Sequence, residues 1–326
     1  MQIHSNNMAK VSVIVPVYGV EKYIERCARS LFEQTLDDIE YLFIDDCTQD
    51  KSIEILESIL EEYPKRKAQV IFHRMPHNSG QAKVREWGIC NATGDYVIHC
   101  DSDDWVDKEM YRLMYEKAKN EGADIVVCDY VQNDGNGNTH RFIGCHEIDT
   151  MTFLINCFYQ IDSWAVWNKL CLRSLYTGIK YPIEAMGEDM VLTMQLLMNC
   201  KSVAYVSFPL YNYYINPESI TKQPTIERCM RNYNQIKKNT GIIINLLSYE
   251  NGNTMNLSFV IPYLKYNVMT MLLPLVGKRC YYNIWKNTYE NFSKDFLLEK
   301  KIPLIYKIRY LLTLIHLYPQ KKNRML

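Results

Sequence analysis

The sequence has no excess of charge of either sign. Its 37 lysines and arginines balance 37 aspartates and glutamates, so the formal net charge is zero. A chain without net positive charge has no overall electrostatic attraction to nucleic acid, and we expect no nucleic-acid partner. The sequence also has no internal repeat and no low-complexity tract, while 48% of its residues are hydrophobic. These features predict a folded protein with a sizeable core.

Two further signals are absent. The eleven cysteines form no CxxC pair, and an odd number without zinc-type spacing argues against a disulfide framework and a structural zinc site. The first ten residues, MQIHSNNMAK, lack the basic start and apolar run of a secretory signal. We therefore expect reduced, mostly buried thiols and a cytoplasmic protein.

No apolar run is long enough to predict a membrane span. The best candidate, residues 259–276, contains Pro262, Lys265, Asn267 and Pro274. A spanning helix needs about 20 mostly apolar residues. We expect a buried helical hairpin instead.

Short apolar runs do alternate with amphipathic stretches along the first half of the chain. Residues 21–34 and two later segments, one capped by Thr48 or Asp50 and one ending near Ala92, have helical spacing. The expected strands are rich in β-branched and aromatic residues: Val11–Val15, Tyr41–Ile44, Val70–Phe72, Tyr96–Ile98 and Ile125–Val127. This alternation predicts an α/β fold, a doubly wound and mostly parallel sheet with helices on both faces.

Polar residues stand where several of these strands end. Tyr18, Asp45-Asp46 and the stretch from Asp101 to Asp104 each follow a predicted strand. In parallel α/β sheets ligands bind beyond the carboxyl ends of the strands. We therefore expect a nucleotide site at this edge.

The stretch Asp101-Ser102-Asp103-Asp104 predicts a metal site. Neighbouring carboxylates repel one another unless a cation or hydrogen-bond donors offset their charge. Their hard oxygens suit Mg²⁺ or Mn²⁺ bound together with substrate phosphates. A solvated acidic loop or a helix start is the alternative explanation.

Several segments together resemble family 2 glycosyltransferases of the GT-A fold. The resemblance covers about residues 10–220, and its motifs occur in the order and at the spacing found in that family. The matching segments are VSVIVPVY at 11–18, YLFIDDCTQD at 41–50, residues 78–88, ATGDYVIHCDSDDW at 92–105, WNKL at 167–170 and Gly187-Glu188-Asp189.

The resemblance implies an inverting, metal-dependent transfer of a sugar from a nucleotide sugar, with UDP as the expected nucleotide. The acceptor would be a saccharide or lipid-linked saccharide hydroxyl, in surface polysaccharide or glycolipid synthesis. The alternatives are a nucleotide-sugar-binding protein with impaired catalysis and, further away, a sugar-phosphate nucleotidyltransferase. The latter would have a glycine-rich basic loop after the first strand, where this chain has Tyr18-Gly19-Val20-Glu21.

By the same resemblance, most donor-site roles can be carried over to single positions. Pro16, Val17 and Tyr18 would line the nucleotide pocket, with Tyr18 against the base. Asp46 would accept a hydrogen bond from the base. Arg85 would approach the diphosphate or base. Asp101 and Ser102 would lie near the ribose or donor sugar, and Asp103 would ligate Mn²⁺ or Mg²⁺.

The acceptor half of the resemblance contains the expected general base. Asp189 would take the proton of the acceptor hydroxyl, and Glu188, Trp167 and Lys169 are candidates for the same site. Without the family context, Asp189 could simply cap the helix whose apolar spacing begins at Val191.

The chain departs from the family at Tyr214, where relatives often have arginine. If that arginine normally holds the diphosphate, another cation must replace it. Lys83, close to Arg85, is a candidate, and a solvated surface lysine is the alternative. Trp87 and His99 also differ from the commonest pattern, and the sequence assigns them no role.

We expect a catalytic domain over residues 1–225 and a mainly helical region over residues 226–326. Asp134–Asn138 has the composition of a hairpin turn, and Asn216–Thr225 that of a linker. After Glu299 the charged residues are all basic and alternate with Ile and Leu. Such a segment predicts peripheral contact with an anionic membrane, at the inner face of the cell membrane, or else a terminal helix packed on the catalytic domain.

Overall fold

The computed structural model describes residues 9–134, 139–144, 149–215, 225–249 and 257–317. The chain divides into two compact units. The α/β unit comprises residues 1–182 and 192–219, and the helical unit comprises residues 183–191 and 220–326. The short segment 183–191, which we expected in the first domain, thus belongs to the helical unit.

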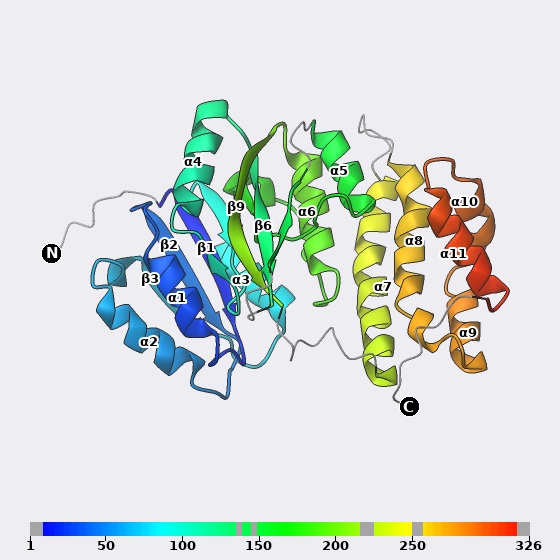
Figure 1. The fold of residues 1–326 in the computed structure, drawn as a ribbon, viewed down its shortest axis with the longest axis horizontal. Coiled ribbons are helices and arrows are strands. Elements are labelled where there is room, and N and C mark those ends of the chain that lie inside the picture. The colour runs from blue at the N-terminus through cyan, green and yellow to red at the C-terminus, as the bar shows by residue number, and fades with distance from the viewer. Residues whose placement is uncertain (1–8, 135–138, 145–148, 216–224, 250–256, 318–326) are drawn as a thin grey trace. The chain divides into compact units, whose positions relative to one another are not determined.

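Four parallel strands form the first half of the sheet in the α/β unit. Their order is β3-β2-β1-β4, and β1 and β2 are buried along almost their whole length. Because the chain moves outward from β1 to β3 and then returns to β4, right-handed crossovers put α1 and α2 on one face and α3 on the other. Figure 1 shows α1 and α2 side by side next to these strands. The bounds are β1 Val11–Val17, α1 Ile24–Phe32, β2 Ile39–Asp45, α2 Ser52–Glu62, β3 Val70–Arg74, α3 Gln81–Asn91 and β4 Tyr96–His99.

The second half of the sheet is mixed, so the expectation of a mostly parallel sheet holds only for the first half. The order continues β4-β8-β6-β9-β5, with β7 paired to β6. β8 is antiparallel to both β4 and β6, whereas β9 is parallel to β6. The bounds are β5 Trp105–Val106, α4 Met110–Glu121, β6 Ile125–Asn133, β7 Thr139–Phe142, α5 Thr150–Phe158, β8 Lys169–Leu172, α6 Glu188–Asn199 and β9 Val203–Tyr214.

Some local expectations can be compared with the described residues. β6 and β7 pair antiparallel on either side of the expected hairpin turn, whose residues 135–138 lie outside the described part, as does most of the expected linker. Asp50 accepts from the Ser52 N–H at the start of α2, although Lys51 occupies the N-cap position. The ten cysteines of the described part are free thiols, and most of them are buried.

The helical unit has an aromatic core. Tyr266 stacks on Phe296 with ring centroids 4.8 Å apart, Tyr310 meets Phe296 edge-on, and Trp285 is fully buried. The expected hairpin over residues 259–276 is wrong: this segment forms one helix, α8, and then a 3₁₀ turn that contains Pro274. The bounds are α7 Ile226–Tyr249, α8 Ile261–Thr270, α9 Arg279–Lys286, α10 Phe292–Leu298 and α11 Leu304–Leu314.

None of the helices within the described ranges has the length and apolar character that a membrane crossing requires.

Candidate functional site

The expected site residues of the first half follow neighbouring parallel strands at one edge of the sheet. Val17, the last residue of β1, lies opposite Asp45, the last residue of β2. Tyr18 and Asp46 therefore leave the sheet side by side. Tyr18 is 53% exposed, Pro16 is half-buried and Val17 is buried. An exposed aromatic ring at this edge offers a face on which a base can stack.

The Asp46 carboxylate holds the loop that leads into α3. It is buried, and its two oxygens accept from the backbone N–H groups of Ser79 (2.6 Å) and Gly80 (2.9 Å). Gly80 has a φ of +83°, a conformation that glycine adopts without steric cost. Asp46 thus fixes the start of α3. A hydrogen bond from a nucleotide base would have to use the remaining lone pairs of the Asp46 carboxylate.

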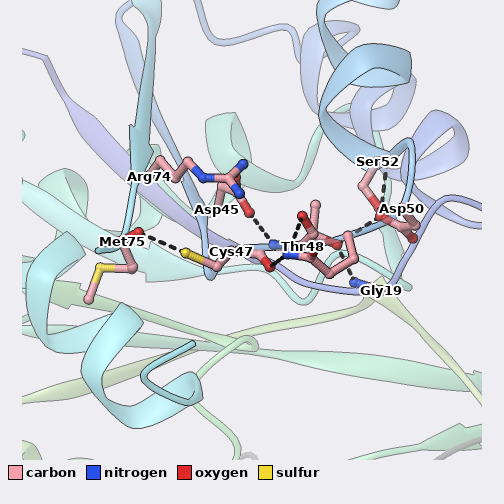
Figure 2. Close-up of polar contacts among 9 residues, drawn as sticks. Gly19, Asp45, Cys47, Thr48, Asp50, Ser52, Arg74 and Met75 are labelled. Atoms are coloured by element: carbon pink, nitrogen blue, oxygen red, sulfur yellow. Dashed lines mark hydrogen bonds and ion pairs between the residues drawn. The ribbon is translucent and has the colours of Figure 1, made fainter. Parts of the chain in front are cut away.

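A network of hydrogen bonds connects the loop after β1 to the loop after β2 (Figure 2). The backbone N–H of Gly19 donates to the Thr48 hydroxyl at 2.9 Å, and that hydroxyl donates to Asp50 at 2.7 Å. The Asp50 carboxylate also accepts from the Glu21 N–H at 2.9 Å and from the Ser52 hydroxyl at 2.6 Å. Burial works against its ionised form, but these donors outweigh that effect and lower the pKa of Asp50.

The same loop is closed on its other side by Asp45 (Figure 2). Its carboxylate accepts from the Thr48 N–H at 2.7 Å and forms an ion pair with Arg74 at 2.6 Å. Cys47 takes a left-handed conformation, with a φ of 61°, and its thiol donates to the Met75 carbonyl at 2.9 Å. Hydrogen bonds therefore hold the loop of the YLFIDDCTQD segment against the backbone that follows Tyr18.

Arg85 of α3 and Asp101, which follows β4, form a largely buried ion pair. The Arg85 Nη2 lies 2.6 Å from the Asp101 Oδ1, which also accepts from Gln81 at 3.2 Å. The Arg85 side chain is 2% exposed and that of Asp101 is 22% exposed. Arg85 thus orients the Asp101 carboxylate, and Asp101 keeps a partly exposed side.

Asp104 anchors the acidic loop to β9. Its Oδ2 accepts from the Tyr211 hydroxyl and its Oδ1 from the Tyr214 N–H, both at 2.6 Å. The same Tyr211 hydroxyl accepts from the Asp101 N–H at 3.1 Å. Burial, and then the charges of Asp101 and Asp103, raise the pKa of Asp104 well above its ordinary value. Asp104 thus serves the loop's structure, while Asp101 and Asp103 are partly exposed and Ser102 is buried.

Arg26 of α1, which the sequence did not single out, supports the same loop. Its Nη2 donates to the Asp103 carbonyl at 2.9 Å. Its guanidinium carbon lies 3.7 Å from the centroid of the Trp105 ring and 4.9 Å from that of the Tyr214 ring. A surface hollow of about 590 Å³ adjoins it, lined by Lys22, Glu25, Arg26, Arg29, Ser30, Glu33, Trp105, Val106 and Lys108.

The replacement of the missing arginine by Lys83 stays a prediction. Lys83 is exposed and pairs with Glu86 at 2.7 Å, whereas Arg85, two positions along α3, is buried. Residues two apart on a helix do not face the same side. Arg26, by contrast, contacts Tyr214 itself.

The acidic loop suits a divalent cation that is bound together with a phosphate. Over the described ranges, no group of three or more His, Cys, Asp and Glu side chains could hold a metal ion by itself. Mg²⁺, however, is commonly bound through one or two carboxylates together with substrate phosphates, and Mn²⁺ favours the same oxygen ligands. The partly exposed Asp101 and Asp103 provide such a set.

Trp167 and Lys169 are buried in the α/β unit. Trp167 stacks on Tyr211 with ring centroids 4.2 Å apart. The Lys169 amine donates to the Ser163 and Ala165 carbonyls, both at 2.7 Å, and to the Asn168 side chain at 2.9 Å. Since an ammonium has three donors, these contacts engage it fully and hold the chain before β8.

Gly187-Glu188-Asp189 lies in the helical unit, at the start of α6. Gly187 has a φ of +83°, and Glu188 and Asp189 occupy the first turn. Glu188 is buried and Asp189 is half-buried. The Asp189 carboxylate belongs to a different unit from Asp103, so their convergence in one cleft stays a prediction.

Asn239 of α7 holds the backbone that leads to Asp189. It is fully buried, and its Oδ1 accepts from the Ile183 N–H at 3.0 Å. Its Nδ2 donates to the carbonyls of Glu184 at 2.7 Å and Met186 at 2.9 Å. Lys238 adds an ion pair with Glu184 at 2.5 Å. The sequence gives no sign of this role for Asn239, because a polar residue in a helix is not expected to be buried.

Comparison with known proteins adds to this geometry. Residues 12–184 match the family model described as Glycosyl transferase family 2. The uncharacterized glycosyltransferase EpsJ of Bacillus subtilis is 32% identical over 224 residues. These residues are 66% of this chain and 63% of EpsJ, so the chain spans less than two thirds of that relative.

Two solved structures share the fold. Staphylococcus aureus TarS 1–349, in complex with UDP-GlcNAc, aligns with a TM-score of 0.67 and 19% identity, over 94% of this chain and 86% of that one. The mannosyltransferase PcManGT of Pyrobaculum calidifontis, in complex with GDP-Man and Mn²⁺, aligns with a TM-score of 0.52 and 13% identity, over 97% and 89%. With the family model matching more than half of the chain, the protein belongs to the family 2 glycosyltransferases and has their GT-A fold.

Proposed function

We propose that the protein transfers a sugar from a UDP-sugar to an acceptor hydroxyl, with inversion at the anomeric carbon. The observation that carries this proposal is the acidic loop 101–104, which Asp104 and Arg26 hold at the carboxyl edge of the sheet. The strand before this loop, β4, pairs in parallel with β1, whose end the exposed Tyr18 follows. A site of this kind combines an aromatic face for a base with carboxylates for a sugar and a cation. The TarS structure with UDP-GlcNAc supports the choice of nucleotide.

In this proposal the site residues of the α/β unit bind the donor or position the groups that bind it. Tyr18 stacks on the base. Pro16 and Val17 line one side of the base pocket, and the loop that Asp46 fixes lines the other. Asp101, oriented by the buried Arg85, accepts hydrogen bonds from hydroxyl groups of the ribose or the donor sugar. The hydroxyl of Ser102, between Asp101 and Asp103 in the sequence, binds the same part of the donor in this proposal.

Asp103 is the proposed ligand of Mn²⁺ or Mg²⁺. The bound ion would offset the charge that develops on the diphosphate as its bond to the sugar breaks. PcManGT was solved with Mn²⁺, which supports a metal-dependent reaction. Because Arg26 holds the Asp103 carbonyl, the Asp103 carboxylate can bind the ion without a change in the backbone of the loop.

Asp189 is the proposed general base. The acceptor oxygen attacks the anomeric carbon on the face opposite the diphosphate, and its proton passes to the Asp189 carboxylate. The bond between the anomeric carbon and the diphosphate oxygen breaks, and UDP leaves with that electron pair. A single displacement of this kind inverts the configuration and needs no covalent intermediate. Glu188, Trp167 and Lys169 act in this proposal by shaping the acceptor half.

The acceptor is proposed to be a saccharide or a lipid-linked saccharide. The full name of TarS, poly(ribitol-phosphate) β-N-acetylglucosaminyltransferase, describes a polymer acceptor. By analogy this chain would act in surface polysaccharide or glycolipid synthesis, on the cytoplasmic side of the membrane.

The donor can be identified by a hydrolysis screen. Purified protein is incubated with UDP-Glc, UDP-GlcNAc, UDP-Gal or GDP-Man, each with Mn²⁺, Mg²⁺ or EDTA, and the released nucleotide is measured. We expect one UDP-sugar to be hydrolysed in a metal-dependent way. Full activity after complete metal removal would reject the role of Asp103. Release of pyrophosphate from a sugar phosphate and a nucleoside triphosphate would indicate a nucleotidyltransferase.

Two substitutions separate catalysis from donor binding. We expect Asp189→Asn to abolish transfer while donor affinity, measured by calorimetry, stays nearly unchanged. Asp103→Asn should lose both metal-dependent donor binding and activity. Asp295→Asn is the matched control, since Asp295 is an exposed acidic residue in the first turn of α10. Wild-type turnover in Asp189→Asn would overturn the assignment of the base, and donor binding without turnover in the wild type would identify an impaired binding protein.

A further inference from the structure

One face of α11 is apolar and exposed. Leu304, Ile308, Leu311 and Ile315 recur at positions i, i+4, i+7 and i+11, so they form one stripe along the helix and the residue that follows it. Their exposed fractions are 70%, 41%, 45% and 60%. Ile305 widens the stripe with 52% exposure. We call these five side chains the α11 stripe.

The opposite face of α11 packs within the helical unit. Tyr310 and Thr313 are buried, and the Tyr310 ring lies edge-on to Phe292 and Phe296 of α10. Tyr306 meets the Tyr263 ring of α8 with centroids 5.2 Å apart. The helix is therefore anchored by its aromatic face, and no side chain of the α11 stripe belongs to the buried core of this unit.

Basic residues border the stripe, and the sequence beside it has no acidic residue. From Lys300 to the last residue, every charged side chain is Lys or Arg. Lys300 and Arg309 are exposed, and Lys307 is fixed by hydrogen bonds to the carbonyls of Leu297 (2.9 Å) and Glu299 (2.6 Å). Glu299, the last acidic residue, is half-buried and accepts from the Lys301 N–H at 2.9 Å. Lys321, Lys322 and Arg324 lie outside the described residues.

We infer that the α11 stripe docks on the surface of an anionic lipid bilayer. An exposed apolar stripe alone would equally suit a second copy of the chain. Charge decides between the two: two copies of this segment would bring basic residues together, whereas an anionic surface attracts them. The leucine and isoleucine side chains enter the boundary between headgroups and acyl chains, and the cations lie against the headgroup phosphates.

This inference goes beyond the proposed reaction and does not depend on the donor, the metal or Asp189. A bilayer contact made by a terminal helix would keep the protein at the membrane surface. It would therefore act on acceptors at that surface in preference to acceptors in solution.

Vesicle co-sedimentation tests the inference without any activity measurement. The full chain is mixed with phosphatidylcholine vesicles that contain or lack phosphatidylglycerol. We expect binding to the anionic vesicles only, and we expect it to weaken as salt is added. Lys300→Gln with Arg309→Gln, and separately Ile308→Gln with Leu311→Gln, should each reduce the partition coefficient by about tenfold or more.

The substituted side chains are exposed, so both variants should fold, which circular dichroism and thermal unfolding would verify. The matched control is Ile143→Gln with Phe208→Gln, which removes two side chains of the α/β unit that are each 60% exposed. Its vesicle binding should equal that of the wild type. Absence of binding to anionic vesicles, or an equal loss in the control, would overturn the inference. A second result would also overturn it: light scattering shows a dimer of the wild type, and only the variant with Ile308→Gln and Leu311→Gln is a monomer, while its vesicle binding is unchanged.

Discussion

The Arg26 guanidinium lies over the Trp105 ring, with its central carbon 3.7 Å from the ring centroid. The two residues come from α1 and β5, and Trp105 directly follows the acidic loop. The same guanidinium donates to the Asp103 carbonyl, so the pair fixes the backbone of the proposed metal ligand. Burial lowers the pKa of Arg26, but an arginine stays charged at any pH at which the protein is folded.

We expect Arg26→Lys to weaken the apparent affinity for Mn²⁺ or Mg²⁺ by about tenfold, since a lysine lacks the planar group that stacks and donates at once. A purely structural role would lower stability without changing the metal dependence. The measurement is donor hydrolysis as a function of metal concentration. Arg29→Gln is the control, because Arg29 lies on the same helix but pairs with Glu25 and Glu62. An equal change of metal affinity in both variants would contradict this role.

Asn239→Asp should reduce kcat by about tenfold or more. The change replaces the Nδ2 donors by a carboxylate oxygen facing the carbonyls of Glu184 and Met186, so the backbone before Asp189 must move. Donor binding should stay unchanged, since the proposed donor site lies in the other unit. Asn234→Asp, at an exposed position of the same helix, provides the matched control. Loss of donor affinity together with kcat would indicate general unfolding, not displacement of the base.

Much of the first half of the fold can be predicted because its signals are local. β1, β2 and β4 are short, mostly apolar runs, and Tyr18, Asp46 and the acidic loop follow them at the same edge of the sheet. The mixed second half could not be predicted, since β8 and β9 pair with strands remote in the sequence. Their direction depends on tertiary packing, which local patterns do not encode.

In the candidate site, residue types could be predicted more readily than partners. The acidic loop was evident, but the sequence cannot tell that Asp104 is bound to Tyr211 while Asp103 is backed by Arg26. Lys169 shows the same limit: its motif suggests a ligand contact, yet its amine is engaged by the chain itself. Long-range hydrogen bonds made by ordinary polar residues have no sequence signature.

His99 should make the protein sensitive to mild acid. It is buried, and neither ring nitrogen has a hydrogen-bond partner in the described part of the chain. Burial, and then the charge of Arg85, lower its pKa well below the ordinary value. The unfolded chain therefore binds a proton below about pH 6.5 that the folded chain does not, and the free energy of unfolding falls by up to about 1.4 kcal/mol per pH unit.

This acid effect can be measured by urea denaturation at pH 7.5 and pH 5.5. His99→Leu keeps an apolar side chain at the position and removes the titrating group, so its stability should fall by about 1 kcal/mol less than that of the wild type over this interval. The control is His77→Gln, because His77 is exposed. Identical pH profiles for the wild type and His99→Leu would show that the pKa of His99 does not differ between the folded and the unfolded chain.

Gly94, within the ATGD segment, should not tolerate even alanine. A Cβ at this position would lie 2.7 Å from the Ser12 backbone nitrogen and 2.9 Å from the Val11 carbonyl carbon. The Gly94 N–H also donates to the Ser12 hydroxyl at 2.8 Å, which itself donates to Glu40 at 2.6 Å. Because backbone atoms of a central strand cannot give way, we expect Gly94→Ala to lower the free energy of unfolding by about 2–3 kcal/mol or more.

The matched control for Gly94 is Gly241→Ala in α7, where the added Cβ would meet no atom within 4 Å. Alanine favours the helix over glycine by about 0.5–1 kcal/mol, so this variant should be slightly more stable than the wild type. Urea denaturation measures both changes. If the two variants lost equal stability, the close approach of Gly94 to β1 could not be the cause.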